Sequence, residues 1–245
     1  MSDFPVIELD FTDSTNNYAM QLIDANKAQP GMTIVARQQR IGKGQRGRTW
    51  LDEPGQSLLM SIIAEPRRPL KDQFVFSAAV AVAVANVLQK LSPGTDVKIK
   101  WPNDIIINDK KAGGILIENI LRGSQWTHSI IGIGINVKQE KFHWSLPNAT
   151  SIKIAFGADP DIHLLRQEIT REVLAGVTVP LPAATVMQEY NSLLYRRDGK
   201  QKLSRHTFDW MVTVLSVLED GRLEVKLQDA TREYYQHGDV KWEWG

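Results

Sequence analysis

The longest apolar stretch of the sequence, from Asp72 to Leu91, restricts the fold more than any other segment. Its middle reads AAVAVAVANVL, so small apolar side chains cover nearly every side of the helix that this stretch predicts. The most apolar part, Phe74 to Leu88, is shorter than the roughly 20 residues that a bilayer-spanning helix needs, and it contains Ser77 and Asn86. We therefore expect a buried helix that packs against a sheet, and no membrane segment.

The segments on either side of this helix predict the sheet that would cover it. Apolar or alternating runs indicate strands at residues 4–11, 32–38, 56–64, 96–101 and 115–120, with the second and third antiparallel, and a further strand that ends at Val137. Residues 109–114 (DKKAGG) predict a turn, and residues 138–160 have no regular pattern. Helices are expected near residues 16–26, 164–177 and 183–195.

Residues 37–50 (RQQRIGKGQRGRTW) form a basic, glycine-rich segment without an acidic residue. Glycines let a backbone approach a ligand closely and present N–H groups to it, and cationic side chains bind phosphate or carboxylate oxygens. The segment therefore predicts a loop that folds over an anionic ligand, and the alternative is a solvated surface loop. Its basic residues are Arg37, Arg40, Lys43, Arg46 and Arg48, and its glycines are Gly42, Gly44 and Gly47.

Other features exclude several function classes. Residues 42–47 match G-x-G-x-x-G, but the chain continues without helical periodicity to the turn at Pro54-Gly55, which argues against a dinucleotide site. The chain has 29 Lys and Arg residues against 28 Asp and Glu residues, so its net charge is near zero. The positive charge of the basic loop is therefore a local feature and not part of a nucleic-acid-binding surface. The absence of cysteine excludes thiol catalysis and disulfides. The five histidines are scattered, so we expect no metal held by the protein alone.

Three further polar or glycine-rich patterns are candidate site features. Residues 14–16 (STN) offer several small polar side chains before a helix, where they either cap the helix or hydrogen-bond a neutral ligand group. Residues 100–104 (KWPND) end a strand, and loops at strand ends commonly carry function. In residues 130–137 (IIGIGINV) glycine alternates with isoleucine, so one strand face is bare backbone against which an element or a ligand packs.

The C-terminal part of the chain has a different pattern. Residues 196–202 are polar and predict a domain boundary. Beyond them, runs at 207–218 and 222–227 flank the Asp220-Gly221 hairpin signal. We therefore expect a catalytic domain at residues 1–197 and a small β-barrel domain at residues 198–245.

Taken together, four segments resemble the biotin–protein ligases in order and spacing. They are Ser14-Thr15-Asn16, the basic loop ending in Arg48-Thr49-Trp50, the KWPND segment, and residues 111–116 (KAGGIL) together with Gly134-Ile135-Asn136. The resemblance covers residues 1–140 most strongly. It implies an α+β fold with a mixed sheet and helices similar to the catalytic domain of class II aminoacyl-tRNA synthetases, and an SH3-like barrel at the C-terminus.

The resemblance also implies a reaction in two steps. Biotin and ATP with Mg²⁺ give biotinyl-5′-AMP and pyrophosphate, and biotin then passes to one lysine of a biotin carboxyl carrier domain of a biotin-dependent carboxylase. The expected enzyme is cytoplasmic, binds neither DNA nor a membrane, and forms a homodimer as many relatives do.

Family positions assign roles to the residues of this sequence. Lys111 and Arg48 are the catalytic candidates, although Lys111 on its own could be an ordinary exposed turn lysine. The biotin-binding candidates are Ser14, Thr15, Asn16, Gln39, Lys43, Gly44, Gln45, Lys111 and Gly114. The ATP-binding candidates are Arg46, Arg48, Trp50, Asn103, Asp104 and Asn136, the last three for ATP, magnesium or loop anchoring.

The sequence departs from the family pattern in two places. The family loop usually reads G-R-G-R, whereas this chain has Gly42-Lys43-Gly44-Gln45, which replaces both arginines. Lysine lacks the bidentate fork of arginine, and glutamine lacks its charge. Members that repress transcription carry an N-terminal helix-turn-helix domain, and with the first motif at Ser14 we expect no such domain here.

Three other functions compete with biotin ligation. A lipoate or octanoate ligase or transferase would have a similar catalytic fold but lacks the basic loop combined with KWPND. A binding module that holds biotin or a nucleotide without catalysis would not need Lys111. A DNA-binding regulator is disfavoured by the near-neutral charge.

Overall fold

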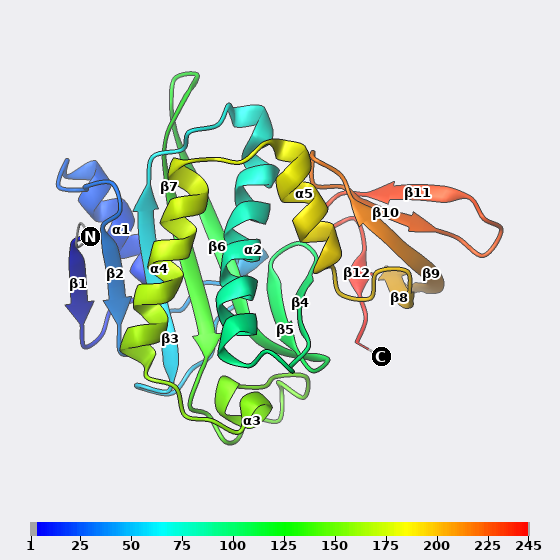
Figure 1. Cartoon of the computed structure of the whole chain (residues 1–245), viewed down its shortest axis with the longest axis horizontal. Helices are drawn as coiled ribbons and strands as arrows, with labels where there is room; N and C mark the ends of the chain where they lie inside the picture. Colours follow the sequence, from blue (N-terminus) through cyan, green and yellow to red (C-terminus); the bar gives the residue numbers. More distant parts are fainter. Residues whose placement is uncertain (1–3, 245) are drawn as a thin grey trace.

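The computed structural model describes residues 4–244 (Figure 1). Within these residues the larger of two sheets has seven strands in the order β1-β2-β3-β7-β6-β5-β4. β1 and β2 run parallel because α1 crosses over between them, and the remaining neighbours are antiparallel. The strands are β1 (Val6–Leu9), β2 (Thr33–Ala36), β3 (Ser57–Ala64), β4 (Val97–Lys100), β5 (Asp104–Ile107), β6 (Lys110–Arg122) and β7 (Gln125–Asn136). The predicted antiparallel pairing of residues 32–38 with 56–64 is confirmed as β2 with β3.

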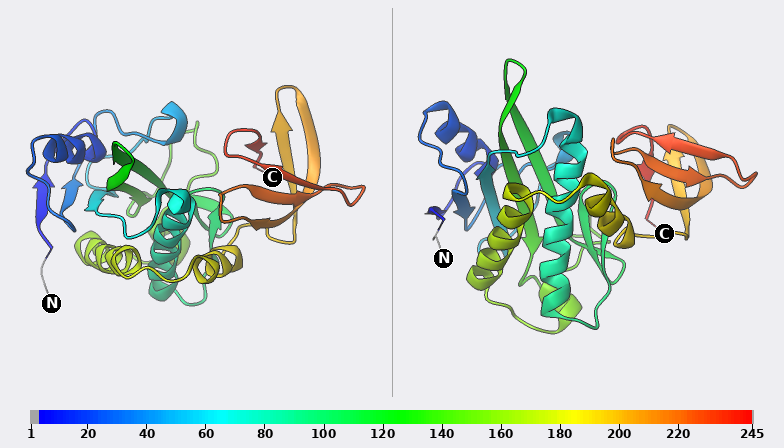
Figure 2. Two further views of the ribbon diagram at one scale, coloured as in Figure 1. Left: turned by 90° about the horizontal axis from the view of Figure 1, so that it is seen from above. Right: turned by 45° about the horizontal axis from the view of Figure 1, so that its top comes forward.

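Three helices form a layer on one face of this sheet (Figure 2). They are α2 (Gln73–Leu91), α4 (Ile162–Thr178) and α5 (Ala183–Ser192), and the short turn η2 (Leu70–Asp72) leads into α2. α2 lies between the other two and buries Val80, Val84 and Leu88 completely. By length and composition alone, residues 70–91 could span a membrane. In the structure, however, 61% of an apolar 18-residue stretch of this segment is buried inside the protein. The expected buried helix is therefore confirmed.

The opposite face of the sheet carries α1 (Thr15–Asp24). Its apolar stripe places Ala19 and Ile23 against Ile34, Ile63 and Ile130 in a cluster separate from the main core. Because side chains alternate along a strand, β3 contributes to both faces at once. The first turn of α1 is thereby held next to the middle of the sheet.

The predicted turn at residues 109–114 is wrong. The turn is limited to Asn108-Asp109, both at positive φ, and it joins β5 to β6 in a hairpin where Ile107 pairs with Lys110. Asn and Asp tolerate this conformation, so they form a two-residue hairpin loop. Lys111 consequently lies in a strand and not in an exposed turn, opposite Ile106. Residues 138–160, expected to be irregular, contain the short helix α3 (Ile152–Phe156).

The second sheet has five antiparallel strands within residues 200–242, in the order β11-β10-β9-β8-β12. The hairpin predicted at Asp220-Gly221 is confirmed between β9 and β10. The first strand begins at Lys200, inside the segment expected to be a loop. The strands are β8 (Lys200–Arg205), β9 (Phe208–Val217), β10 (Leu223–Lys226), β11 (Arg232–Tyr235) and β12 (Lys241–Trp242).

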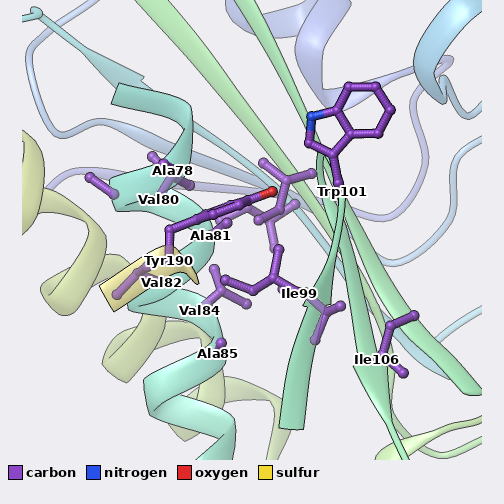
Figure 3. Packing of buried hydrophobic residues seen from close by; sticks show 14 of the residues in the cluster. Ala78, Val80, Ala81, Val82, Val84, Ala85, Ile99, Trp101, Ile106 and Tyr190 are labelled. Atoms are coloured by element: carbon purple, nitrogen blue, oxygen red, sulfur yellow. The ribbon is translucent and has the colours of Figure 1, made fainter. Parts of the chain in front are cut away.

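The two sheets are joined by a shared core and not by a free linker. The buried Trp101 donates from Nε1 to the carbonyl of Gly221, 2.9 Å away. Asn191 of α5 exchanges two hydrogen bonds with the backbone of Val217. Figure 3 shows the Tyr190 side chain lying across α2 with its hydroxyl group pointing toward the strand that carries Ile99 and Trp101, and Tyr190 donates to the carbonyl of Pro102. The KWPND segment therefore lies where the second sheet meets the first.

Candidate active site

A cavity of about 1380 Å³ lies between the bare face of the large sheet and the second sheet. It contains every residue that the sequence predicted for the site, although those residues are spread over more than a hundred positions. The predicted residues that line it are Ser14, Thr15, Asn16, Gln39, Lys43, Gly44, Gln45, Arg46, Arg48, Trp50, Asn103, Asp104, Lys111, Gly114 and Asn136.

One end of the cavity is a buried polar pocket at the start of α1. Ser14 and Thr15 are 2% and 3% exposed, and the Ser14 side chain makes no capping hydrogen bond to the described part of the chain. Thr15 instead donates from its backbone N–H and its hydroxyl to Oε1 of Gln39, at 2.8 and 3.1 Å. Simple capping therefore does not account for this cluster, because its side chains face the cavity.

Asn16 is fixed more tightly than any other residue of this pocket. Its Nδ2 donates to Oε2 of Glu118 at 2.6 Å and to the carbonyl of Leu116 at 3.3 Å, while its Oδ1 accepts from Ser61 Oγ at 2.6 Å. Asn16 is 3% exposed, so these bonds form away from water. Both N–H groups of Asn16 are therefore used inside the protein, and Oδ1 keeps one acceptor lone pair in a fixed position.

The glycines of β7 make room for these side chains. A Cβ added at Gly132 would overlap Oδ1 of Asn16, and one added at Gly134 would lie 3.0 Å from the ring of Trp50. Gly114 of β6 likewise faces Trp50. Two protein side chains therefore cover the glycines of β7, and these glycines also line the cavity, so the packing of a ligand on this face stays a prediction.

The basic loop is folded on itself beside this wall. The N–H of Gly44 donates to the carbonyl of Arg48 at 2.7 Å, and Lys43 pairs with Thr49 in an isolated antiparallel β-bridge. These contacts close the chain on either side of the short turn η1 (Gln45–Gly47). After the turn the backbone at Arg48 is extended, in keeping with the exclusion of a dinucleotide-binding helix. Lys43 Nζ lies 3.7 Å from Oε1 of Glu118, so one carboxylate links the loop to the polar pocket.

The middle of the cavity contains a lysine–aspartate cluster. Lys111 Nζ lies 2.6 Å from Oδ1 of Asp104, and Lys100 Nζ lies 3.8 Å from Oδ2. Burial lowers the pKa of Lys100, Asp104 pulls it upward, and Lys111 and Arg48 lower it further. Two lysines facing one carboxylate leave a surplus of positive charge in a partly dry site, where it acts strongly on an anion.

Asn103 and Asn136 hold backbone segments around Lys111. Asn103 donates to the carbonyl of Ile115, and Asn136 donates to that of Thr150 at 3.0 Å. Residues 148–150 in turn pair with Lys111, whose N–H donates to the carbonyl of Asn148 at 2.7 Å. This geometry favours anchoring among the roles considered for the two asparagines.

The site includes residues that the sequence patterns missed. Lys100 is almost buried, and its Nζ lies 5.7 Å from the ring centroid of Trp242 and 5.1 Å from that of Trp244. His237 stands edge-on to Trp101, and its pKa is lowered by burial and by Arg46 and Arg48, against an upward pull from Asp104. The position of Lys100 directly before the strand end was the available signal for it. No local signal marked the second-sheet residues, which are Ser204, Arg205, His206, Thr207, Asp209 and residues 237–244.

Among residues 4–244, no three His, Cys, Asp or Glu side chains lie close enough together to hold a metal ion. Two buried side-chain atoms of residues that line the cavity lack a hydrogen-bond partner within the same range, namely Nε1 of Trp50 and Oε1 of Gln45. Buried polar atoms normally have a partner.

Comparison with known proteins gives matches over the same region. The family described as the biotin/lipoate A/B protein ligase family matches residues 8–136. The bifunctional ligase/repressor BirA of Bacillus spizizenii is 38% identical over 135 residues, which is 55% of this chain and 41% of that protein. BirA of Escherichia coli is 32% identical over 174 residues, which is 70% of this chain and 53% of that protein. The chain thus spans about half the length of these relatives.

A solved structure extends the likeness to the whole fold. The biotin protein ligase from Aquifex aeolicus in complex with biotin and ATP has a TM-score of 0.79 with 22% sequence identity, and the match covers 98% of this chain and 99% of that one. At this identity the likeness concerns the fold alone, including the second sheet.

Proposed function

The chain belongs to the biotin/lipoate A/B protein ligase family, and we propose that within this family it is an ATP-dependent biotin–protein ligase. It would form biotinyl-5′-AMP from biotin and ATP and transfer the biotin to a specific lysine of a biotin carboxyl carrier domain. The observation that carries the proposal is a single cavity in which a buried pocket of neutral polar groups leads to the Lys100–Asp104–Lys111 cluster.

The polar pocket favours biotin over the other acids that the family takes. The ring system of biotin ends in a ureido group, which has two N–H donors and one carbonyl acceptor. Asn16 Oδ1 accepts one hydrogen bond and keeps a second lone pair, and the amide nitrogen of Gln39 donates no hydrogen bond within residues 4–244, so the pocket keeps an acceptor and donors for this group next to the buried Thr15 and Asn16. A dithiolane ring or an alkyl chain would leave such groups without partners, at a cost of about 1–3 kcal/mol for each.

The lysine–aspartate cluster supports the first step. In that step a carboxylate oxygen of biotin attacks the α-phosphorus of ATP, and pyrophosphate leaves. The two reacting groups are both negative, so fixed positive charge must lie between them. Lys111 has this role in our proposal, with Lys100 and Arg48 nearby. Asp104 orients the two lysines, because its two oxygens face one ammonium group each.

The basic loop supports the second step. In that step the amine of the carrier lysine attacks the biotinyl carbonyl, its proton is lost, and AMP leaves. Until then the mixed anhydride must be kept from water. We assign this retention to residues 42–49, with Lys43 and Arg46 carrying the charge that the family's arginines usually supply. Arg48, Trp50 and the remaining ATP-binding candidates would contact the nucleotide.

Magnesium would arrive with ATP. Asp104, the carboxylate nearest to the reacting groups in this proposal, is already paired with two lysines. The phosphate oxygens of ATP are the hard ligands that Mg²⁺ prefers. When bound, the ion would neutralise charge on the leaving pyrophosphate.

The competing function is lipoate or octanoate ligation. Pyrophosphate release should be measured with ATP and each of biotin, lipoate and octanoate, followed by labelling of a carrier domain with and without its target lysine. Release that depends on biotin, and labelling that depends on the target lysine, would support the proposal. Release with lipoate or octanoate instead of biotin would refute it, and biotin binding without release would indicate a non-catalytic module.

The remaining expectations belong to the same proposal. We propose that residues 1–197 form the catalytic domain and residues 198–245 an SH3-like barrel that contributes to ATP or carrier binding. We also propose that the enzyme acts in the cytoplasm on a biotin-dependent carboxylase, without DNA or membrane as a partner. A homodimer would form through the outer edge of β1, the end strand of the large sheet.

A further inference from the structure

The basic loop contacts the second sheet where the guanidinium of Arg46 lies over Gly238. Arg46 Nη1 donates to the carbonyl of His237 at 3.3 Å, across 191 positions of sequence. A Cβ added at Gly238 would overlap Nη1 and lie 2.7 Å from Nη2. The φ of Gly238 is +99°, which other residues rarely adopt. The space over this glycine is therefore filled by the arginine.

The turn that contains Gly238 is a fixed part of the second sheet. The N–H of Gln236 donates to Oδ2 of Asp239 at 2.8 Å, and Arg205 Nε donates to the carbonyl of Asp239 at 2.8 Å. The ring of His237 lies against Trp101, which is itself bonded to Gly221. Because these contacts hold the turn from three sides, it would not move aside for a larger residue at position 238.

Both ends of the basic loop are attached to the large sheet and to the segment before α1. The N–H groups of Arg40 and Ile41 donate to the carbonyls of Thr12 and Asp13, and the ring of Trp50 covers Gly134. Between these ends, residues 42–49 close a hairpin on themselves, and the side-chain contacts of this hairpin with the rest of the protein include Lys43 on Glu118 and Arg46 on the turn at residues 237–238. The first contact is an ion pair whose side chains are 41% and 33% exposed, and such pairs contribute little. The second contact also involves an exposed side chain, and it places the guanidinium of Arg46 directly over the backbone of Gly238.

We infer that Gly238 is a positioning residue. Together with the carbonyl of His237 it forms a binding site for the guanidinium of Arg46, and through this contact the second sheet holds the basic loop over the cavity. This inference rests on the proposed function, because what the loop retains is the biotinyl-AMP. It assigns the C-terminal unit a part in retaining the intermediate without contact between that unit and the biotin ring. It also gives Arg46 a partner inside the protein in addition to its predicted contact with phosphate.

The test compares Gly238→Ala, Arg46→Ala and the double variant with the wild type. Gly123→Ala is the matched control, since Gly123 also has a positive φ (+62°) but no neighbouring atom within 4 Å. Enzyme, biotin and ATP are incubated with a carrier-free protein mixture, and streptavidin blotting measures bystander labelling. Pyrophosphate release is measured in the same samples, so that labelling is expressed per adenylate formed.

We expect about tenfold more bystander labelling per adenylate in each single variant, and no further increase in the double variant. Gly123→Ala should label as the wild type does. Backbone hydrogen exchange in residues 42–49 should rise in Gly238→Ala and Arg46→Ala alike. If Gly238→Ala fails to fold, Arg46→Lys decides, because it keeps the positive charge but lacks the guanidinium that lies over Gly238; labelling per adenylate should rise in it as in Arg46→Ala, and labelling at the wild-type level would overturn the inference.

Three further outcomes would overturn the inference: unchanged labelling in Gly238→Ala, effects that multiply in the double variant, or unchanged exchange in Arg46→Ala. The proposed function fails separately. If the wild type showed no biotin-dependent pyrophosphate release, the ligase assignment would be refuted. If the wild type released pyrophosphate but the variants labelled bystanders no more than the wild type, only the proposed contact between Gly238 and Arg46 would be refuted.

Discussion

Gly132 provides the sharpest check on the polar pocket, because its replacement by alanine affects Asn16 before any other residue. The added Cβ would overlap Oδ1 of Asn16 and lie 3.0 Å from its Cγ and Nδ2. Asn16 cannot retreat without losing its bonds to Glu118 and to the carbonyl of Leu116. The backbone of Gly132 is equally fixed, since it pairs with Ser61 on one side and with Leu116 on the other.

The expected magnitude follows from these hydrogen bonds. A bond to a charged carboxylate contributes about 1.5–3 kcal/mol and a neutral one about 0.5–1.5 kcal/mol. Gly132→Ala should therefore lower the free energy of unfolding by about 2–4 kcal/mol. For biotin, the loss of one hydrogen bond of about 1.4 kcal/mol raises Kd roughly tenfold, and a shift of Thr15 together with Asn16 would raise it further.

The assay is calorimetric titration of biotin without ATP, together with urea unfolding. The control is Gly176→Ala, in α4, where no heavy atom lies within 4 Å of the added Cβ. That change should raise stability by about 0.5–1 kcal/mol, as alanine does relative to glycine in a helix, and leave biotin binding unaltered. A Gly132→Ala protein with a Kd within about twofold of the wild type would refute the assignment of Asn16 to the biotin pocket.

Three further predictions concern other parts of the chain. Lys111→Ala should reduce biotin-dependent pyrophosphate release at least about a hundredfold, whereas alanine at the exposed Lys110 should not, and equal rates in the two variants would exclude the charge-bridging role. Trp101→Phe leaves the carbonyl of Gly221 without its donor, so urea unfolding should show a loss of about 1–3 kcal/mol, against under about 0.5 kcal/mol for Trp144→Phe, whose side chain is 85% exposed. Burial raises the pKa of the Asp52 carboxyl group from 3.8 to about 6. The buried group is therefore tolerated fully when it is protonated, below about pH 4, and this contribution to the free energy of unfolding is lost as the pH rises through 6. Asp52→Asn should therefore stabilise the protein at pH 8, by about 1 kcal/mol once the roughly 3 kcal/mol of the full shift is reduced for partial exposure, and the gain should vanish at pH 4; a constant gain across this range would contradict the cause.

Much of the fold followed from patterns within short windows of sequence. The apolar middle of α2 required burial, the alternation in β4 indicated a strand, and Asp220-Gly221 indicated a hairpin. The β5–β6 hairpin was missed because Asn108-Asp109 is a less common turn pair than Asn-Gly and because charged residues open β6. The error placed Lys111 in a turn, although it is held in a strand beside Asp104.

The sequence by itself determined many of the chemical groups that residues 14–136 bring to the site, but not those of the second sheet. Small polar residues before α1, glycines on one face of β7, and cations in the basic loop are local features, and each residue to which the sequence assigned a catalytic or binding role lines the cavity. Only the tertiary structure decided how these groups are paired: Asn16 with Glu118, Lys100 with the tryptophans of the second sheet, and Arg46 with the turn at Gly238. The physical reason is that such pairs join residues about a hundred or more positions apart. Their contacts depend on how the second sheet packs around Trp101, and no periodicity within one segment encodes that packing.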